Sequence, residues 1–125
     1  LVTVTVLRPK SVEFKDTVLA AVHAALVNIG VPEADRFHRV LELPAEDFRF
    51  DRTYPDVQGQ RTDDFILIEI VLSAGRSVKV KRQFLNHLMH SLSSAGHDPE
   101  NVMVIFKETT WENWAFAGGR QIHVQ

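Results

Sequence analysis

Two charged side chains in the sequence could bind or activate a small carbonyl compound. Arg76 stands at the start of a predicted helix, where free backbone amides and the helix dipole also favour anions. Its guanidinium could bind an oxo-acid carboxylate through two parallel hydrogen bonds, or it could be a surface group paired with a nearby carboxylate. Asp35 could orient a water or act as a general acid–base group. Alternatively, Asp35 is a turn residue that bonds its own backbone after a proline.

Three further groups could complete such a site. The rings of Trp114 and Phe116 would form a low-dielectric wall that strengthens electrostatic interactions, although packing in the core or between subunits explains them as well. The α-amino group of Leu1 has a reference pKa of about 7.7–8.0, so a fraction of it is neutral at physiological pH. A neutral primary amine can act as a base or form an imine with a carbonyl substrate.

Other motifs with recognisable chemistry are weak or missing. His87 and His90 lie three positions apart on a predicted helix, but the spacing places no third ligand beside them, so we expect no metal. The sequence has no phosphate loop, dinucleotide fingerprint or nucleophile elbow, so we expect no cofactor. The short basic cluster of residues 79–82 is interpreted as a solvated helix face. The sequence therefore gives no reason to expect a nucleic-acid partner.

The bulk properties are those of one globular domain. The chain has 125 residues, 45% of them hydrophobic, a formal net charge of −2 and no cysteine. The charge argues against general nucleic-acid binding, and the missing cysteine excludes disulfides and thiolate chemistry. No apolar run approaches the roughly 20 residues of a bilayer span, and the first residues are typical of a strand rather than a signal peptide. We expect a cytoplasmic protein without membrane contact.

The candidate residues must be positioned by two similar sets of elements. In the first half, β-branched residues 2–7 predict a strand, and Ser11 is a candidate N-cap of a helix that ends at Gly30. Residues 37–43 then alternate like a second strand. In the second half, residues 65–72 predict a strand buried on both faces. Ser77 and Gly96 bound the second helix, and residues 102–106 predict the last strand.

These signals repeat with a constant offset. Ser11 and Ser77 are separated by the same 66 positions as Gly30 and Gly96 (77 − 11 and 96 − 30). We therefore predict an α+β fold in which duplicated β-α-β units, about 1–50 and 64–110, form a four-stranded sheet with two helices on one face. A C-terminal segment, 111–125, follows in the same domain. The uncovered face must meet water or a partner, and the apolar strand 65–72 favours self-association.

Three segments of the chain resemble the tautomerase superfamily, and within it the group of malonate semialdehyde decarboxylase. Residues 30–37 resemble the segment that carries the catalytic aspartate of that group, with Asp35 in its place. Residues 73–77 resemble a turn that carries two arginines, of which Arg76 is present and Ala74 replaces the other. Residues 114–120 resemble a Trp-x-Phe-x-x-Gly-Arg stretch that helps to wall the pocket. The resemblance covers nearly the whole chain and implies a homotrimer.

One departure concerns the residue on which the chemistry of this family depends. Family members use an amino-terminal proline, exposed by removal of the initiator methionine, as base or acid, whereas the sequence starts with Leu1. A leucine amine lacks the ring that fixes a proline nitrogen, so we expect weaker catalysis. A methionine retained before Leu1 would shift the amine by roughly 3.5 Å along the strand.

The resemblance therefore implies weak or altered activity on a small carboxylate-bearing substrate. Tautomerisation or hydration of a 2-oxo or 3-oxo acid is favoured over efficient decarboxylation, because one carboxylate-binding arginine is missing. Asp35, Arg76 and the amine of Leu1 would be catalytic, and Arg76, Trp114 and Phe116 would bind the substrate. Two alternatives stay open: a non-catalytic trimeric relative that binds a carboxylate metabolite, and a ferredoxin-like dimer of the small monooxygenase or ligand-sensing type.

Overall fold

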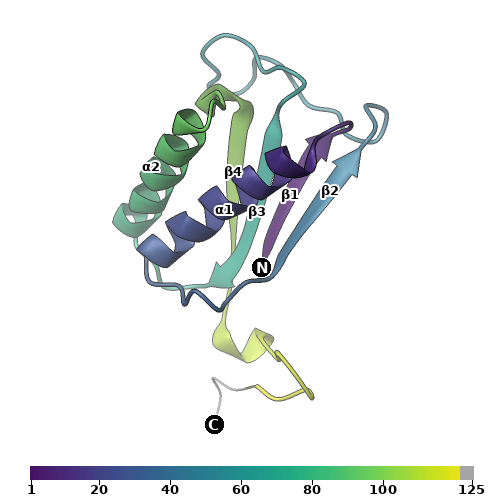
Figure 1. The fold of residues 1–125 in the computed structure, drawn as a ribbon. Coiled ribbons are helices and arrows are strands. Elements are labelled where there is room, and N and C mark those ends of the chain that lie inside the picture. The colour runs from purple at the N-terminus through teal and green to yellow at the C-terminus, as the bar shows by residue number, and fades with distance from the viewer. Residues whose placement is uncertain (122–125) are drawn as a thin grey trace.

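A four-stranded mixed sheet with two helices across one face makes up the fold (Figure 1). The computed structural model describes residues 1–121. The strands lie in the order β2-β1-β3-β4, so the first strands of the two units are neighbours at the centre. In chain order the main elements are β1 (Val2–Leu7), α1 (Val12–Asn28), β2 (His38–Leu43), β3 (Ile66–Ser73), α2 (Val78–Ser94) and β4 (Val102–Thr109).

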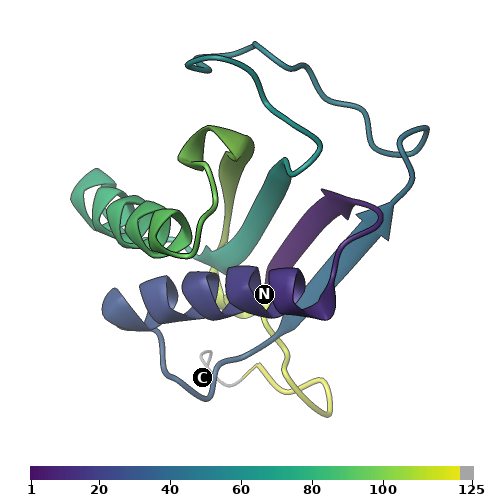
Figure 2. The same cartoon turned by 45° about the horizontal axis from the view of Figure 1, so that its top comes forward.

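The sheet is built from two parallel pairs joined by an antiparallel pair. β1 runs parallel to β2 and β3 runs parallel to β4, as expected when a helix makes the crossover. β1 and β3 are antiparallel, with Val4 opposite Ile68. Both helices lie on the same side of the sheet, as the tilted view in Figure 2 shows. The predicted four-stranded α+β fold with two helices on one face is confirmed.

Matching caps begin the two helices. The hydroxyl of Ser11 accepts a hydrogen bond from the amide of Phe14 at 3.0 Å, and that of Ser77 accepts one from Val80 at 3.2 Å. Each helix is followed by a glycine with a left-handed backbone, Gly30 at φ 103° and Gly96 at φ 92°. A side chain is strained in that conformation, so glycine is the residue that ends a helix there at least cost.

The core lies between the sheet and the helices. β1 contributes Val2, Val4 and Val6, and these pack with buried residues of β3 and of both helices, among them Val22 and Leu88. The expectation that β3 is buried on both faces holds for one face only. Its residues alternate between buried and half-buried, because the face turned away from the helices has no covering layer in the single chain.

A long connection, residues 44–65, joins the two units at the edge of the sheet farthest from the C-terminal segment (Figure 1). Its shape depends on Arg61, which is buried and donates to the backbone carbonyls of Asp51 at 2.8 Å and Tyr54 at 2.5 Å. Arg61 also lies over the ring of Phe65. Within residues 1–121, neither the length nor the apolarity of any helix suffices for a bilayer crossing.

Candidate functional site

One pocket lies at the end of the sheet where β1 and β2 begin and β3 terminates. Its volume is about 220 Å³, and the sequence-predicted residues Leu1, Asp35, Arg76, Trp114 and Phe116 all line it. Drug-sized ligand sites occupy about 300–1,000 Å³, so this cavity suits a smaller molecule. Most of the remaining lining is aliphatic or aromatic and comes from the ends of α1, β1 and β3. The structure thus brings together side chains that are far apart in sequence.

Arg76 enters this pocket from the turn between β3 and α2. Its guanidinium donates to the backbone carbonyl of Ser73 at 3.1 Å, and the side chain is half-buried. The turn is held to the neighbouring strand because the amide of Ala74 donates to the carbonyl of Thr109 at 2.8 Å. Gly75 has φ 119°, a conformation that favours glycine. The guanidinium is therefore anchored by one hydrogen bond, and its planar fork retains further donors for an anion.

Asp35 lies in the connection between α1 and β2. Its backbone amide donates to the carbonyl of Pro32 at 3.0 Å, so Asp35 closes a turn. Its side chain also contributes to the pocket lining. The charge of this carboxylate acts on the terminal amine, whose pKa it raises against a stronger opposing effect. The turn role and a role in the pocket are compatible.

The amine of Leu1 is held by the sheet. It donates to the carbonyl of Val71 at 3.1 Å, while the amide of Val71 donates to the carbonyl of Leu1 at 2.9 Å. Burial lowers the pKa of this amine below its ordinary value of 8.0, and the charge of Asp35 opposes that shift. A larger fraction of the amine is therefore neutral at physiological pH than in a fully solvated chain end.

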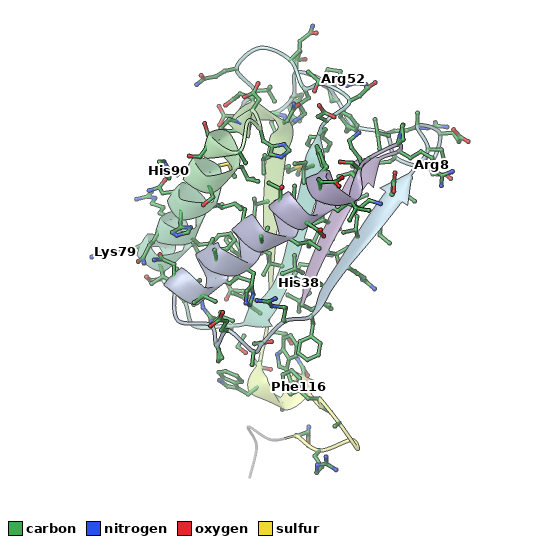
Figure 3. The ribbon with its side chains drawn as sticks, viewed as in Figure 1. Arg8, His38, Arg52, Lys79, His90 and Phe116 are labelled. Atoms are coloured by element: carbon green, nitrogen blue, oxygen red, sulfur yellow. The ribbon has the colours of Figure 1, made fainter. Side chains whose placement is uncertain are left out.

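Aromatic rings form the side of the pocket that faces the C-terminal segment. Trp114 and Phe116 stack at 5.5 Å between ring centroids, with 15° between their planes. Phe37 lies 6.1 Å from Phe116, and Trp111 also lines the cavity. Figure 3 shows the ring of Phe116 beneath the sheet, beside the segment that follows β4. These rings make a largely apolar wall opposite the charged groups.

His38, the first residue of β2, also lines the pocket and was missed in the sequence interpretation. Its Nε2 atom is buried without a hydrogen-bond partner among the described residues. The ring meets that of His23 edge-on at 5.4 Å. Burial lowers the pKa of His38 below 6.5, and the charges of His23, Arg36 and the terminal amine lower it further, against Asp35. A signal was available, because His38 follows Asp35 by three residues and lies near the start of the predicted strand 37–43.

Metal ligation has little support in the described part of the chain. Within residues 1–121, no three His, Asp or Glu side chains are placed so that they could share a metal ion. His87 and His90 both lie on α2, and Nδ1 of His87 is buried without a hydrogen-bond partner in the same range.

Comparisons with known proteins agree with this architecture. The sequence model of a family described as tautomerase enzyme matches residues 35–117. Among solved structures, the chain is similar to FG41 malonate semialdehyde decarboxylase inhibited by 3-bromopropiolate, with a TM-score of 0.89 and 23% identity. That match covers 98% of this chain and 93% of the other. No curated protein sequence matches the chain.

Two further structures extend the comparison. A malonate semialdehyde decarboxylase, described with decarboxylase and hydratase activities, has a TM-score of 0.86 and 25% identity, covering 97% of this chain and 93% of the other. A fused 4-OT described as a symmetric trimer has a TM-score of 0.73 and 24% identity, covering 95% of this chain and 93% of the other. The ferredoxin-like alternative has no support in these matches, and the shared fold is that of the tautomerases.

Proposed function

The chain belongs to the tautomerase enzyme family, and from that premise we propose that it binds a small 2-oxo or 3-oxo acid and catalyses its tautomerisation or hydration. Arg76 binds the carboxylate of the substrate. Asp35 orients a water molecule or polarises the carbonyl group as a general acid–base group. Trp114 and Phe116 hold the rest of the molecule in an apolar environment. The activity is weak or altered compared with efficient decarboxylation.

The observation that carries this proposal is the composition of the pocket. It places one half-buried guanidinium and one carboxylate beside a mostly apolar wall, in a cavity of about 220 Å³. Among the described lining residues Arg76 is the one permanently charged cation. A small monocarboxylate satisfies that charge, and a low-dielectric surrounding strengthens the attraction.

Hydration and tautomerisation are favoured over decarboxylation for a physical reason. Residues 73–77 resemble a turn with two arginines, and Ala74, which is exposed and carries no charge, replaces the second of them. With one guanidinium, the carboxylate is oriented by fewer hydrogen bonds, and loss of carbon dioxide requires strict alignment of the breaking bond with the carbonyl system. Proton transfer at a neighbouring carbon or addition of water is less demanding of that alignment. One of the similar structures is described with both decarboxylase and hydratase activities.

The amine at the start of β1 remains part of the proposal. It lies in the pocket lining and its pKa is lowered by burial, which favours the neutral, basic form. The hydrogen bond from Leu1 to Val71 occupies one of its protons, so its freedom to approach a substrate is limited. In the antiparallel register, Val2 opposes Ile70 and Leu1 opposes Val71, so a residue before Leu1 would oppose Leu72, another residue of the pocket.

Intact-mass measurement of the purified protein identifies the residue that carries the amine. A mass equal to that of the printed sequence assigns the amine to Leu1. A larger mass would place it one or more positions further along the strand, by roughly 3.5 Å per residue. The kinetic experiment below is interpreted on the chain end found in this way.

A second candidate function is binding of a carboxylate metabolite without turnover. The observation that favours it is the same hydrogen bond between the amine of Leu1 and the carbonyl of Val71. An amine held in the sheet is a poorer base than one that is free to move. In both functions we propose that the chain assembles as a homotrimer through the uncovered sheet face, as the fused 4-OT is described to be a trimer.

Ketonisation of phenylenolpyruvate, followed by the loss of enol absorbance, tests the enzymatic proposal. Arg76→Ala should lower kcat/KM about 10- to 100-fold, since a hydrogen bond to a charged group is worth about 1.5–3 kcal/mol. Asp35→Asn should lower kcat by a similar factor. Arg82→Ala is the matched control, because Arg82 is exposed on α2 and does not line the pocket.

Three outcomes separate the candidate functions. A rate above the uncatalysed reaction that depends on Arg76 and Asp35 supports the enzyme. Binding that depends on Arg76 without rate enhancement supports the carboxylate-binding protein. Equal rates for the wild type, Arg76→Ala and Asp35→Asn would remove both residues from the chemistry.

A further inference from the structure

Four of the described residues that line the pocket carry titratable groups, and they differ in burial and in hydrogen bonding. They are the amine of Leu1, Asp35, His38 and Arg76. The amine donates to Val71, and Arg76 donates to Ser73 and stays charged at all relevant pH values. Asp35 is exposed. Nε2 of His38, by contrast, is buried and has no hydrogen-bond partner among the described residues.

His38 lies between two cavities, the oxo-acid pocket and a groove along α1. It opens β2 directly opposite Val2, and the amide of Val2 donates to the carbonyl of the preceding Phe37 at 2.8 Å. His38 lines the oxo-acid pocket and also a second groove of about 660 Å³, which lies along α1 and includes His23, Glu33 and Arg36. Figure 3 shows its ring between the end of α1 and the sheet, above the aromatic cluster of Phe116.

The neighbouring side chain of His23 is anchored at one ring nitrogen. Nε2 of His23 lies 2.9 Å from the carbonyl oxygen of Glu33, and a carbonyl can only accept, so this nitrogen carries the proton. Nδ1 of His23 is buried without a partner among the described residues. Two imidazoles with unsatisfied nitrogens thus meet edge-on between the pocket and the groove.

Burial, together with the charges around His38, lowers the pKa of its ring and favours the neutral form at physiological pH. Burial is the largest effect that lowers its pKa, followed by His23 on α1, Arg36 in the adjoining connection and the amine at the start of β1. Asp35 acts in the opposite direction. Asp16 and Glu33 also line the groove on the other side of the ring. A neutral imidazole has one nitrogen that accepts a proton and one that donates, which is the state that proton transfer requires.

We propose that His38 is the catalytic residue whose imidazole carries the proton in the oxo-acid chemistry of this pocket. This inference rests on the proposed function. The proton-transfer role of His38 is separate from the binding of the carboxylate by Arg76, and the composition of the pocket does not by itself require it. The groove along α1 gives the ring a second route by which a proton can reach solvent.

The proton balance of the step is closed without a further reactant. The unprotonated ring nitrogen of neutral His38 takes the proton of the enol hydroxyl, and the electron pair of that O–H bond forms the C=O bond. The pair of the C=C bond takes the same proton back from the imidazolium at the adjacent carbon. The substrate changes from enol to ketone, and His38 returns to its neutral form. Arg76 holds the carboxylate throughout, so both transfers occur within one orientation of the substrate.

Substitution of His38 by glutamine tests the assignment. His38→Gln keeps a polar side chain of similar length but cannot carry a proton, so kcat for phenylenolpyruvate ketonisation should fall by about 100-fold or more, with little change in KM. The acid limb of the wild-type kcat profile against pH, which reports protonation of His38, should disappear. His90→Gln is the matched control, because His90 is exposed on α2 and should leave kcat, KM and the profile unchanged.

The outcomes distinguish this inference from the function on which it rests. If the wild type accelerates the reaction and Arg76→Ala impairs it, but His38→Gln retains the wild-type kcat and acid limb, only the role of His38 is overturned. If the wild type does not accelerate the reaction, both the enzymatic function and the role of His38 are overturned.

A measurement on the wild-type protein covers the case in which His38→Gln does not fold. Benzoylformate is a 2-oxo acid without an enolisable proton, so it can occupy the pocket without reacting. In protein labelled with ¹⁵N-histidine, its addition should shift the Nε2 resonance of His38 and leave that of His90 in place. An unchanged His38 resonance at saturating benzoylformate would contradict the proposal.

Discussion

At the scale of single residues, a few titratable groups in the pocket shift one another's pKa values. The amine of Leu1 lowers the pKa of His38, and Asp35 raises the pKa of both. In each case burial is the largest cause, and it favours the neutral form. The pocket therefore holds two nitrogen bases whose neutral forms are favoured by burial, close to one carboxylate and to Arg76, which we propose binds the substrate anion.

The lowered pKa of His38 has a consequence for stability. Between pH 6.5 and its pKa in the folded protein, the unfolded chain binds more protons at this position than the folded chain does. The free energy of unfolding therefore falls as the pH falls through this window, and below it His38 causes no further loss. Urea unfolding measured from pH 7 down to about pH 5, above the range where most carboxylates titrate, should show this decline.

Two variants identify the source of the decline. His38→Gln should flatten the pH dependence across that window, since the side chain no longer titrates. His90→Gln removes an exposed histidine from α2 and should leave the wild-type slope intact. A decline of equal steepness in His38→Gln would show that another group controls stability there.

The residue scale also shows the limit of interpretation from sequence. Arg76 and Asp35 could be selected because their types and local context suit carboxylate binding and acid–base chemistry. The signal for His38, its place three residues after Asp35, was weaker, because its packing against His23, 15 positions earlier (38 − 23) on another element, is visible only in the structure. The hydrogen bond from Leu1 to Val71 likewise depends on strand register, which no local pattern specifies.

At the scale of elements, the start of α2 determines where Arg76 lies. Arg76 directly precedes the cap residue Ser77, whose backbone is extended at φ −73° and ψ 165°. The cap hydrogen bond to Val80 fixes the direction in which the chain enters the helix. α1 begins in nearly the same way at Ser11, with φ −72° and ψ 160°, but no residue of that cap lines the pocket.

This duplication provides an internal control for a prediction. Ser77→Ala and Ser11→Ala should each destabilise the protein by about 1 kcal/mol, because each leaves a first-turn amide without its acceptor. Ser77→Ala should in addition raise KM for phenylenolpyruvate, since the turn that carries Arg76 loses its anchor. Urea unfolding and steady-state kinetics on both variants check the two effects.

Two outcomes would contradict the positioning of Arg76 by the Ser77 cap. In one, Ser77→Ala and Ser11→Ala change KM equally; in the other, Ser77→Ala changes the stability but not KM. In the first case the effect would be a general loosening of the fold. In the second case the position of Arg76 would be fixed by its hydrogen bond to Ser73 and by Gly75, independently of the cap.

Most elements were predictable because their signals are local. Helix starts at Ser11 and Ser77 follow from side chains that cap amides a few residues away, and the glycines after each helix mark their ends. The single chain covers one face of β3, and the predicted burial of its other face depends on a partner, because consecutive apolar residues do not show which chain supplies the covering layer. The outward-facing Glu69 of β3 forms an ion pair with Lys107 of β4 instead of meeting an apolar layer.

At the scale of the whole molecule, the sheet face opposite the helices has no covering layer in a single chain. Met103 and Ile105 of β4 are each 37% exposed and Leu41 of β2 is 42% exposed. On the same face, Thr3 and Thr5 of β1 are buried, with Thr3 accepting a hydrogen bond from Arg39 at 2.9 Å. A face of this mixed composition can be covered by copies of the same chain.

We expect the protein to be a trimer of about 43 kDa in light scattering, three times the 14.2 kDa of one chain. Ile105→Lys places a charge within the proposed interface and should shift the mass toward that of the single chain, because burying an unpaired charge is costly. Val12→Lys is the control, since Val12 is an equally apolar residue exposed at the start of α1. A monomeric wild type, or an Ile105→Lys variant that stays trimeric, would contradict this assembly.

Tryptophan fluorescence directly tests the proposal that Arg76 holds a carboxylate in the pocket. Both tryptophans of the chain, Trp111 and Trp114, line this pocket, so their emission reports its occupation. Titration with benzoylformate should give a saturable change in the wild type and in Arg82→Ala, and should require about 10- to 100-fold more ligand in Arg76→Ala. Equal affinity in Arg76→Ala, or no saturable change in the wild type, would contradict the claim.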